Sequence, residues 1–392
     1  MEWKLKDLTV DGKGSYGIGA PAIPYQEDKL TYLRITDIND DGSLNFSDLK
    51  SVDAEDAEKY ILKENDIVFA RTGNSTGRSY FYEKQHGTFV YAGFLIKFSL
   101  DPNKVNPRIL KYYTHSKPYF DWVNSFDTGA TRGNINAKTY GDMEIELPSR
   151  KVQDKIVSIL SSLDRKIELN NKINADLEEM AQAIFKNWFV DFEPFKDGKF
   201  VDSELGMIPE GWKVGGLFDI AEIFDKKRKP LSGNVREKMD KIYPYYGATS
   251  CMDYVDDYIF DGIYTLIGED GSVVKENGLP YMQYVWGKMW VNNHAHILQG
   301  KNGYSTEMIH ALLSITNIKF LVTGAVQAKL SQGNMQKIFV AIPPKNVLDE
   351  IRPVIDNLYS KIRINTDENS RLSLLRDTLL PRLMSGELEV PE

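Results

Sequence analysis

Apolar residues recur at alternating steps of four and three in two long stretches of the chain, a heptad pattern that predicts amphipathic helices. The stretches cover residues 156–184 and 351–379, and an asparagine lies at the middle of each. At about 1.5 Å per residue, each stretch would form a rod of about 43 Å. The predicted seam positions are Ile156, Leu160, Leu163, Ile167, Asn170, Leu177 and Ile184 in the first helix, and Ile351, Ile355, Leu358, Ile362, Asn365, Leu372 and Leu379 in the second.

The two stretches are copies of one another. A shift of 195 positions, without gaps, places the first seam on the second, and Thr128-Gly129-Ala130 on Thr323-Gly324-Ala325. Solenoid repeats have periods of roughly 20 to 50 residues, so this longer period indicates a duplicated domain followed by a helix. Arg376 is a polar exception in the second seam. Pro353 is expected in the first turn of its helix, where proline is tolerated.

An approximate two-fold relation between the copies predicts that the two helices pair in antiparallel orientation. Asn170 and Asn365 would then meet at the centre of a coiled coil, where a buried polar pair fixes the register at some cost in stability. Ile159, Ile173 and Met180 are expected to widen the buried stripe of the first helix.

The segments that precede the helices mix strand and helix signals. A β-rich run at 66–70 leads into a polar loop, residues 108–113 have a helical pattern, and 262–271 repeat the strand-then-turn design. The predicted fold class is α+β, with two similar mixed α/β domains separated by an antiparallel two-helix coiled coil. The predicted boundaries are a first domain at 1–148, a spacer helix at 149–192, a second domain at 193–343 whose leading linker is 193–211, and a C-terminal helix and tail at 344–392.

Composition adds few constraints. A chain of 392 residues can form two or three domains, and its 42% hydrophobic and 27% charged residues are ordinary for soluble proteins. No apolar run is long enough to span a membrane. The single cysteine, Cys251, excludes an internal disulfide framework and fits the cytoplasm. The net charge of −8 does not favour a generic polyanion binder, although local clusters of Lys and Arg decide that property.

The sequence predicts no catalytic, metal or cofactor site. The loop Gly73–Ser79 has two glycines, but only three residues separate them and Arg78 replaces the lysine of a phosphate-binding loop. His294 and His296 would point to opposite faces of a strand, without a cysteine or acidic cluster nearby in sequence to complete a metal site. Glu269 and Asp270 are adjacent in a turn, rather than converging from separate elements as catalytic carboxylates do.

Motifs in and around the predicted helices resemble the specificity subunit of type I restriction-modification enzymes. The resemblance is carried by residues 153–157, 163–170, 178–195, 206–212 and 375–388, and the overall layout extends it to essentially the whole chain. The first helix is preceded by Leu147-Pro148-Ser149 rather than by a double proline, whereas the second keeps Pro343-Pro344.

The resemblance implies a non-catalytic subunit in which each domain is a target recognition domain for one half of a split DNA site. The coiled coil would set the spacing between the halves, which lie roughly 34 to 36 Å apart when they are one helical turn apart. The expected partners are double-stranded DNA, two methyltransferase subunits and restriction/translocase subunits. Cofactors are expected only in those partners, as S-adenosylmethionine, ATP and Mg.

Candidate DNA contacts are polar side chains in loops, because base edges are read by hydrogen bonds from Arg, Asn, Gln and acidic residues. Arg132 and Lys329 are the preferred candidates, since they precede the closing strands of the two domains at similar places. The full set is Arg71, Thr72, Asn74, Ser75, Arg132, Asn134 and Asn136 in the first domain, and Lys226, Lys227, Arg228, Glu269, Asp270, Ser272, Lys329 and Ser331 in the second.

Two other classes of function remain open at this point. A protein-interaction scaffold with duplicated domains would show no DNA sequence preference at any salt concentration. An autonomous nuclease would cut DNA alone in the presence of a metal ion. The target sequence itself cannot be read from the chain.

Overall fold

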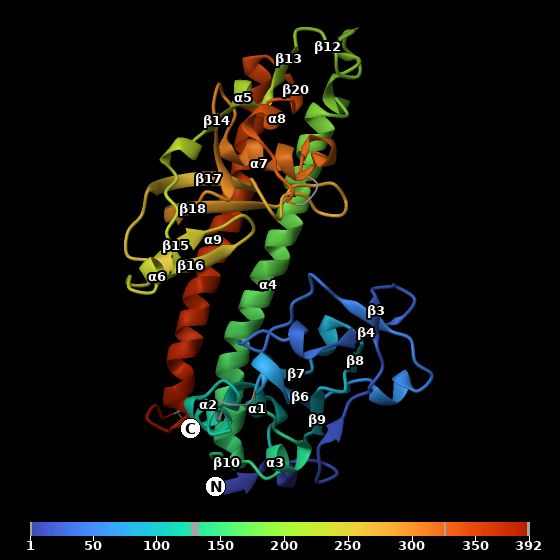
Figure 1. The fold of residues 1–392 in the computed structure, drawn as a ribbon, viewed down its shortest axis with the longest axis vertical. Helices are drawn as coiled ribbons and strands as arrows, with labels where there is room; N and C mark the ends of the chain where they lie inside the picture. The colour runs from blue at the N-terminus through green and yellow to red at the C-terminus, as the bar shows by residue number, and fades with distance from the viewer. Residues whose placement is uncertain (1, 127–132, 325–326, 390–392) are drawn as a thin grey trace. The chain divides into compact units, whose positions relative to one another are not determined.

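The computed structural model describes residues 2–126, 133–324 and 327–389 and divides the chain into two compact units. The first unit comprises Met1–Glu168 and Asn369–Glu392, and the second comprises Leu169–Glu368. The division runs through two 40-residue helices, α4 (Arg150–Phe189) and α9 (Lys345–Met384) (Figure 1). Each unit therefore contains a globular domain, one end of α4 and the opposite end of α9.

The globular part of the first unit is built on two four-stranded sheets, ordered β2-β9-β6-β7 and β3-β5-β4-β8, and a two-stranded pair, β1-β10. Strand β6 is buried along its whole length. The ring of Phe69, in this strand, packs against the rings of Phe98 and Tyr140 in the core. The strands are β1 (Glu2–Lys4), β2 (Ser15–Tyr16), β3 (Ala22–Pro24), β4 (Leu30–Leu33), β5 (Lys50–Val52), β6 (Asp66–Ala70), β7 (Ser79–Phe81), β8 (Phe89–Tyr91), β9 (Leu95–Ser99) and β10 (Glu144–Glu146). The α-helices before α4 are α1 (Pro107–Tyr113), α2 (Lys117–Asn124) and α3 (Ala137–Gly141), and the 3-10 turns are η1 (Leu5–Leu8), η2 (Ile35–Asp37), η3 (Ala57–Tyr60), η4 (Gly73–Ser75) and η5 (Lys84–His86).

The second unit has a larger sheet of six strands, ordered β14-β19-β17-β18-β15-β16, and two pairs, β13-β20 and β11-β12. Helix α7 (Thr306–Ser314) covers strands β17 and β19 and is almost wholly buried. The strands are β11 (Phe200–Val201), β12 (Ile208–Pro209), β13 (Lys213–Gly216), β14 (Ala221–Ile223), β15 (Tyr243–Tyr246), β16 (Cys251–Val255), β17 (Phe260–Gly268), β18 (Met282–Val291), β19 (Ala295–Gly300) and β20 (Phe339–Ile342). The remaining helices and turns are α5 (Leu217–Ile220), α6 (Gly233–Arg236), α8 (Gln332–Met335), η6 (Glu193–Phe195), η7 (Asp225–Lys227) and η8 (Lys319–Leu321).

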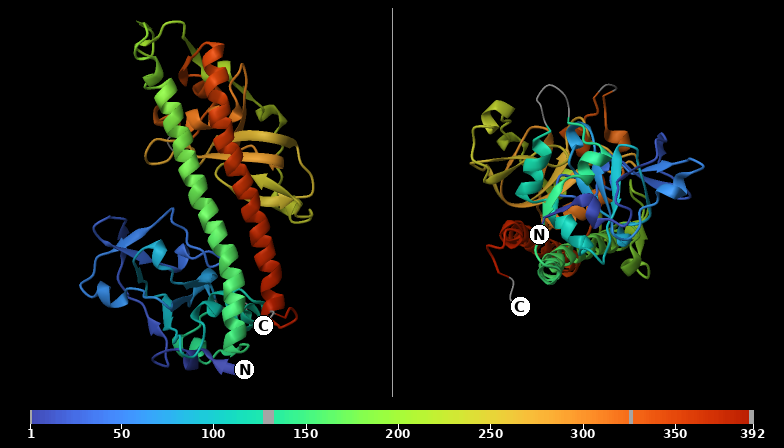
Figure 2. Two further views of the ribbon diagram at one scale, coloured as in Figure 1. Left: turned by 180° about the vertical axis from the view of Figure 1, so that it is seen from behind. Right: turned by 90° about the horizontal axis from the view of Figure 1, so that it is seen from below.

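The predicted fold class is confirmed: two mixed α/β domains share one plan, and α4 and α9 are antiparallel within each unit. In the second unit the C-terminal part of α4 runs beside the N-terminal part of α9 in the opposite direction (Figure 2, left). All of the predicted seam residues are buried or half-buried. Ile173 is half-buried, but Ile159 and Met180 are exposed, because two paired helices bury only a narrow seam. No helix among the described residues has an apolar stretch long enough to cross a bilayer.

The predicted pairing of Asn170 with Asn365 is wrong by about one helical turn. Within the second unit, Asn365 donates from Nδ2 to Oδ1 of Asn174 at 2.9 Å, and Asn170 donates from Nδ2 to Oε2 of Glu368 at 2.8 Å. Both asparagines are nevertheless buried in the seam, as expected. A central polar layer was therefore predictable, whereas its register depends on how the whole seam packs.

Pro353 lies inside α9 and is tolerated there through packing. The helix begins eight residues before Pro353, so the prediction that this proline lies in the first turn is wrong. One missing backbone donor is tolerated there because Val347, Leu348 and Ile351 are buried against the second unit's core. Pro381 lies three residues before the end of the helix.

Arg376, the polar exception in the seam, has a buried partner. Its Nη1 lies 3.1 Å from Oδ1 of Asp164 on α4, and Lys111 and Tyr112 of α1 contact the other oxygen of that carboxylate. The carboxylate thus joins both long helices to the globular part of the first unit. In the second unit Arg363 of α9 pairs with Glu307 of α7 at 2.6 Å and joins α9 to the globular part.

Candidate nucleic-acid interface

Backbone hydrogen bonds bring three loops of the first unit together where strand β6 ends. The N–H of Arg71 donates to the carbonyl of Phe94 in the β8–β9 turn at 3.1 Å, and the carbonyl of Arg71 accepts from the N–H of Ile135 at 2.9 Å. Thr72 then forms an isolated antiparallel bridge with Asn134. We call Arg71, Thr72, Phe94 and Asn134 the first corner.

The second unit repeats this arrangement where strand β17 ends. The N–H of Glu269 donates to the carbonyl of His294 in the β18–β19 turn at 2.8 Å, and the carbonyl of Glu269 accepts from the N–H of Leu330 at 2.8 Å. Asp270 forms the corresponding bridge with Lys329. We call Glu269, Asp270, His294 and Lys329 the second corner.

The corners share a backbone but differ at every side chain. Arg71 corresponds to Glu269, Thr72 to Asp270, Phe94 to His294 and Asn134 to Lys329. The first corner thus carries one cation, two neutral polar groups and an aromatic ring, whereas the second carries two acids, an imidazole and a lysine. Similar scaffolds with different polar side chains are suited to bind different ligands of one chemical class.

The other first-unit candidates differ in how available their side chains are. The Arg71 guanidinium lies over the Tyr16 ring, 4.9 Å from its centroid, and its Nε is buried without a hydrogen-bond partner among the described residues. Asn74 is exposed, whereas Ser75 is buried in η4. Asn136 caps α3, where its Oδ1 accepts from the N–H of Thr139 at 2.9 Å. Arg132 lies outside the described residues.

The second-unit candidates fall into exposed and internally paired groups. Lys226, Lys227 and Ser272 are exposed, and the ammonium of Lys227 lies 5.0 Å from the centroid of the Phe224 ring. Lys329 is exposed, with its Nζ 3.6 Å from Oε1 of Glu269. Ser331 caps α8, the role that Asn136 has in the first unit.

Arg228 is turned inward rather than toward solvent. Its guanidinium lies 2.6 Å from Glu269 and 3.3 Å from Asp225, and it also donates to the carbonyl of Ala295 at 2.8 Å. These contacts use the donors that a base would need, so Arg228 holds the second corner in place. We expect its effect on ligand binding to be indirect.

A buried charge network lies behind the second corner. Nε2 of His296 lies 2.7 Å from the carbonyl oxygen of Leu330, and Nδ1 lies 2.5 Å from Asp225. Burial opposes ionisation of Asp225, but the hydrogen bond and charge of His296, together with Arg228, outweigh it and hold the pKa of this carboxyl below its ordinary value. Both ring nitrogens of His296 are therefore occupied by protein oxygens.

The same network bears on metal binding. Ligand atoms of Asp225, Glu269 and His296 all lie within 4.8 Å of one another, a spacing that could hold a metal ion. Both nitrogens of His296 are already hydrogen-bonded, and the Arg228 guanidinium lies against the two carboxylates. The donor set is therefore compensated by protein cations, and a metal would have to displace them.

The sequence did not identify two residues of the corners as candidate contacts. Phe94 is not among the predicted DNA contacts, and the sequence suggests only a metal-ligand role for His294. Their exposed side chains lie in short turns between strands, where nothing in a single sequence distinguishes them from ordinary surface residues. The turn before β9 in the first domain corresponds to the turn before β19 in the second, and this correspondence places Phe94 and His294 at one position.

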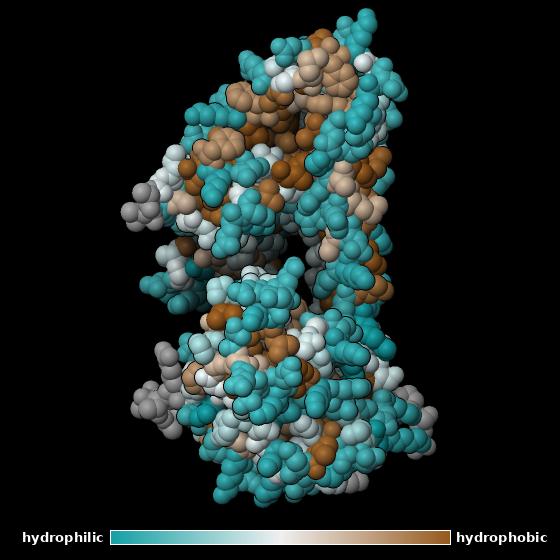
Figure 3. All heavy atoms as spheres, turned by 90° about the vertical axis from the view of Figure 1, so that its right-hand side faces the viewer, coloured by the Kyte–Doolittle hydropathy of each residue, from teal (hydrophilic) through white to brown (hydrophobic). Residues whose placement is uncertain are grey.

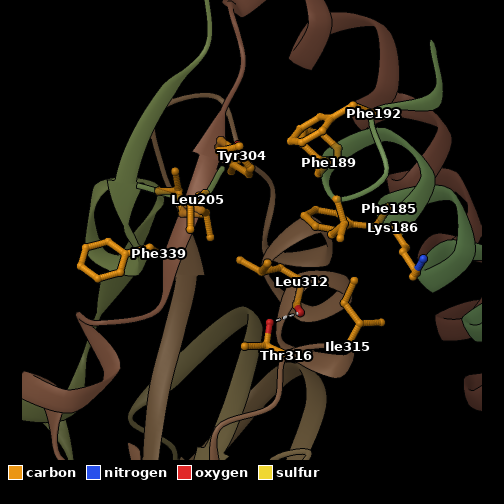
Figure 4. Close-up of a pocket in the computed structure, with 14 residues that line it drawn as sticks. Phe185, Lys186, Phe189, Phe192, Leu205, Tyr304, Leu312, Ile315, Thr316 and Phe339 are labelled. Carbon is orange, nitrogen blue, oxygen red and sulfur yellow. Dashed lines mark hydrogen bonds between the residues drawn. The ribbon is translucent and has the colours of Figure 1, made fainter. Parts of the chain in front are cut away.

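An apolar cavity of about 340 Å³ lies elsewhere in the second unit, beside the end of α4. The space-filling view shows hydrophobic residues gathered around a hollow in this unit (Figure 3). The rings of Phe185, Phe189 and Phe192 line one side, Leu205, Tyr304 and Phe339 lie across from them, and Leu312 and Ile315 lie below (Figure 4). Its one charged lining residue, Lys186, pairs with Asp191 at 2.6 Å. The lining lacks the convergent polar groups that a catalytic pocket needs.

The family model for the type I restriction modification DNA specificity domain matches residues 19–179 and 209–374, which contain the first and second corner respectively. The two matches include most of each duplicated helix and most of the two globular domains.

Curated relatives and a solved structure agree with that match. The MjaIX specificity subunit of Methanocaldococcus jannaschii is 29% identical over 307 residues, covering 72% of this chain and 69% of the relative. The HindI specificity subunit of Haemophilus influenzae is 23% identical over 414 residues, covering 84% and 88%. The crystal structure of the S subunit of a type I restriction-modification system from M. genitalium aligns with a TM-score of 0.56 at 16% identity, over 100% of this chain and 96% of that one. The last comparison supports the fold alone.

Proposed function

Because this chain belongs to the type I restriction-modification DNA specificity family, we propose that its two corners read the two halves of a bipartite DNA target. Each globular domain would contact one half-site through its corner and the loops beside it. Backbone contacts to phosphates would position the domains, and corner side chains would distinguish base edges. The chain would recognise DNA without chemically altering it.

The repeated corner is the observation that carries this proposal. Two domains of one chain keep the same three backbone contacts around a strand end, yet present different side chains there. A stabilising role alone would not require an exposed cation, aromatic ring or imidazole at these positions. Two readers of different half-sites would require this combination of a fixed backbone and variable side chains.

Duplicated surface positions on the helices support binding of two copies of one partner. Three large apolar residues of α4 are exposed, and the residues 195 positions later on α9 are large, apolar and exposed as well. Packing within the coil does not use these positions, so their repetition favours an external role. The pairs are Ile159 with Val354, Leu169 with Ile364, and Met180 with Leu375.

The partners that fit these exposed apolar positions are two methyltransferase subunits. Restriction and translocase subunits would then bind to the assembled complex. S-adenosylmethionine, ATP and Mg would bind to those partners rather than to this chain. The paired helices would hold the two readers at a fixed separation and so set the spacer between half-sites. We place the complex in the cytoplasm, where host DNA is accessible.

The proposal is tested by selecting DNA sequences with the full chain bound to its modification subunits. We expect a split motif with two defined halves and an undefined spacer, and an affinity that falls steeply with salt because phosphate contacts release counterions. A complex without any sequence preference across the salt range would instead favour the scaffold function.

A further inference from the structure

Phe94 and His294 occupy one position in the two domains. Each lies in the turn before the strand that pairs with β6 or β17, and each carbonyl accepts the hydrogen bond that begins the corner. The backbone of both residues is therefore fixed, while both side chains are exposed. The Phe94 residue is 59% exposed, and the His294 side chain is 48% exposed.

An exposed phenylalanine at this place has no packing role that explains it. Arg71, whose backbone is bonded to Phe94, stacks on Tyr16, and Asn134 is exposed on the neighbouring loop. The first corner thus combines an apolar ring with a guanidinium and a carboxamide. Contact between a phenyl ring and the methyl group of thymine is an established mode of apolar base recognition.

The His294 imidazole is oriented by its neighbour. Its Nδ1 lies 2.5 Å from Oδ1 of Asp270, and its Nε2 has no hydrogen-bond partner among the described residues. The contact with Asp270 occupies Nδ1 and fixes the direction of the ring, so Nε2 is the nitrogen left for a ligand. A ring nitrogen held in this way suits a hydrogen bond to a base edge.

Resting on the proposed function, we propose that Phe94 and His294 are equivalent specificity-determining residues, one in each half-site reader. Phe94 makes apolar contact with a thymine methyl group, and Nε2 of His294 forms a hydrogen bond with a base edge. Asp270 is a positioning residue that fixes the direction of the ring.

The test uses the full chain in complex with its modification subunits, and compares DNA selections and binding titrations for wild type and four variants. Phe94→Ala removes the ring. His294→Asn keeps a polar group near the Nδ1 position, whereas His294→Gln places one near the Nε2 position. Phe46→Ala is the matched control, because Phe46 is 49% exposed in the same unit but packs edge-on against His86.

We expect Phe94→Ala to change base preference in one half-site and His294→Asn to change it in the other half-site. Each should weaken binding to the wild-type target by about ten- to a hundredfold, the usual range for one lost base contact. His294→Gln should retain more of the preference than His294→Asn, and Phe46→Ala should behave as wild type. Unfolding midpoints should be unchanged, because the substituted side chains are exposed.

Wild-type preference and affinity in both Phe94→Ala and His294→Asn would overturn this inference and leave the proposed function standing. If the changes fell in the same half-site, the equivalence of the two positions would be wrong. A wild-type complex without sequence preference would overturn the proposed function, and this inference with it.

Discussion

Asn365 donates a 2.9 Å hydrogen bond from Nδ2 to Oδ1 of Asn174 across the paired helices of the second unit. Asn174 in turn donates to Oγ1 of Thr366 at 3.1 Å. Asn365 is 2% exposed, so its amide depends on these protein partners rather than on water. A polar layer inside an apolar seam disfavours other registers, since a shift would leave buried amides without partners.

The first prediction concerns this layer. Asn365→Leu leaves Asn174 without one of its partners and should lower the free energy of unfolding by about 1–3 kcal/mol. Asn174→Leu combined with Asn365→Leu should recover most of that loss, because an apolar layer replaces the polar one. Denaturant unfolding of the full chain measures both changes. Asn357→Ala, an exposed position on α9, is the control; equal losses in the single and double variants would contradict the prediction.

The second prediction concerns Asp164. Its burial opposes ionisation, but Lys111 and Arg376 outweigh that effect and hold the pKa of the carboxyl below its ordinary value. A lowered folded-state pKa stabilises the fold above the unfolded value of about 3.9 and ceases to do so as the pH falls below it. Asp164→Asn should therefore cost about 2 kcal/mol at pH 7 and progressively less below about pH 4.

The control for Asp164 is Asp377→Asn. Asp377 also contacts Arg376, at 2.9 Å, but its side chain is 61% exposed. An exposed ion pair contributes about 0–1 kcal/mol, so this variant should change stability little. Thermal unfolding midpoints between pH 3 and 7 compare the two. A cost for Asp164→Asn that stays constant across this range would refute the assigned role of its charge.

The third prediction separates structural from ligand-binding cations in the second unit. Arg228→Ala removes the cation between Asp225 and Glu269 and should cost about 3 kcal/mol of stability. Lys329→Ala should leave stability within about 0.5 kcal/mol, weaken DNA binding, and reduce the salt slope by about one if Lys329 contacts a phosphate. Unfolding curves and salt-dependent titrations distinguish the two effects. The reverse assignment, with a stable Arg228→Ala variant defective only in binding, would show that the guanidinium contacts DNA.

The fourth prediction concerns the exposed apolar positions on the helices. Met180→Glu with Val354→Glu in the second unit should release one methyltransferase subunit, because a charge is costly to bury in an apolar interface. Ile159→Glu with Leu375→Glu in the first unit should release the other. Native mass spectrometry of the purified complex counts the copies. Retention of both copies in the combined variant would place docking elsewhere.

The fifth prediction concerns spacing. Inserting seven residues after Asn171 in α4 and after Thr366 in α9, beside the central polar layer, keeps the facing residues paired and adds about 10 Å of helix. At 3.4 Å per base pair, the preferred spacer should lengthen by about three base pairs, with both half-sites unchanged. Selection from a library of spacer lengths measures this change. Insertion of three residues in each helix is the control, because it breaks the seam and should destabilise the pairing.

Sequence periodicity was sufficient to predict the helices and their antiparallel pairing, since heptad spacing has a direct physical meaning. It could not predict the register: Asn170 and Asn174 are both polar seam residues, and only packing decides which of them meets Asn365. The ion pair of Arg376 with Asp164 could not be predicted for a similar reason, because Asp164 lies outside the apolar seam pattern. The corners form from loops far apart in sequence, so Phe94 could be recognised only once β6, β9 and residue 135 lay together.

The register of the helices also determines which half-chains can combine. Asp164 faces Arg376 in the first unit, whereas the residues 195 positions away, Tyr359 and Ala181, both lie in the core of the second unit. A symmetric pair of first halves would set Asp164 of each copy against Ala181 of the other, and a pair of second halves would set Arg376 against Tyr359. When a first half pairs with a second half, Asp164 meets the opposite charge of Arg376, and the large ring of Tyr359 is matched with the small side chain of Ala181. The coiled coil therefore disfavours homodimers of either half. A first half and a second half that are expressed separately should form a heterodimer.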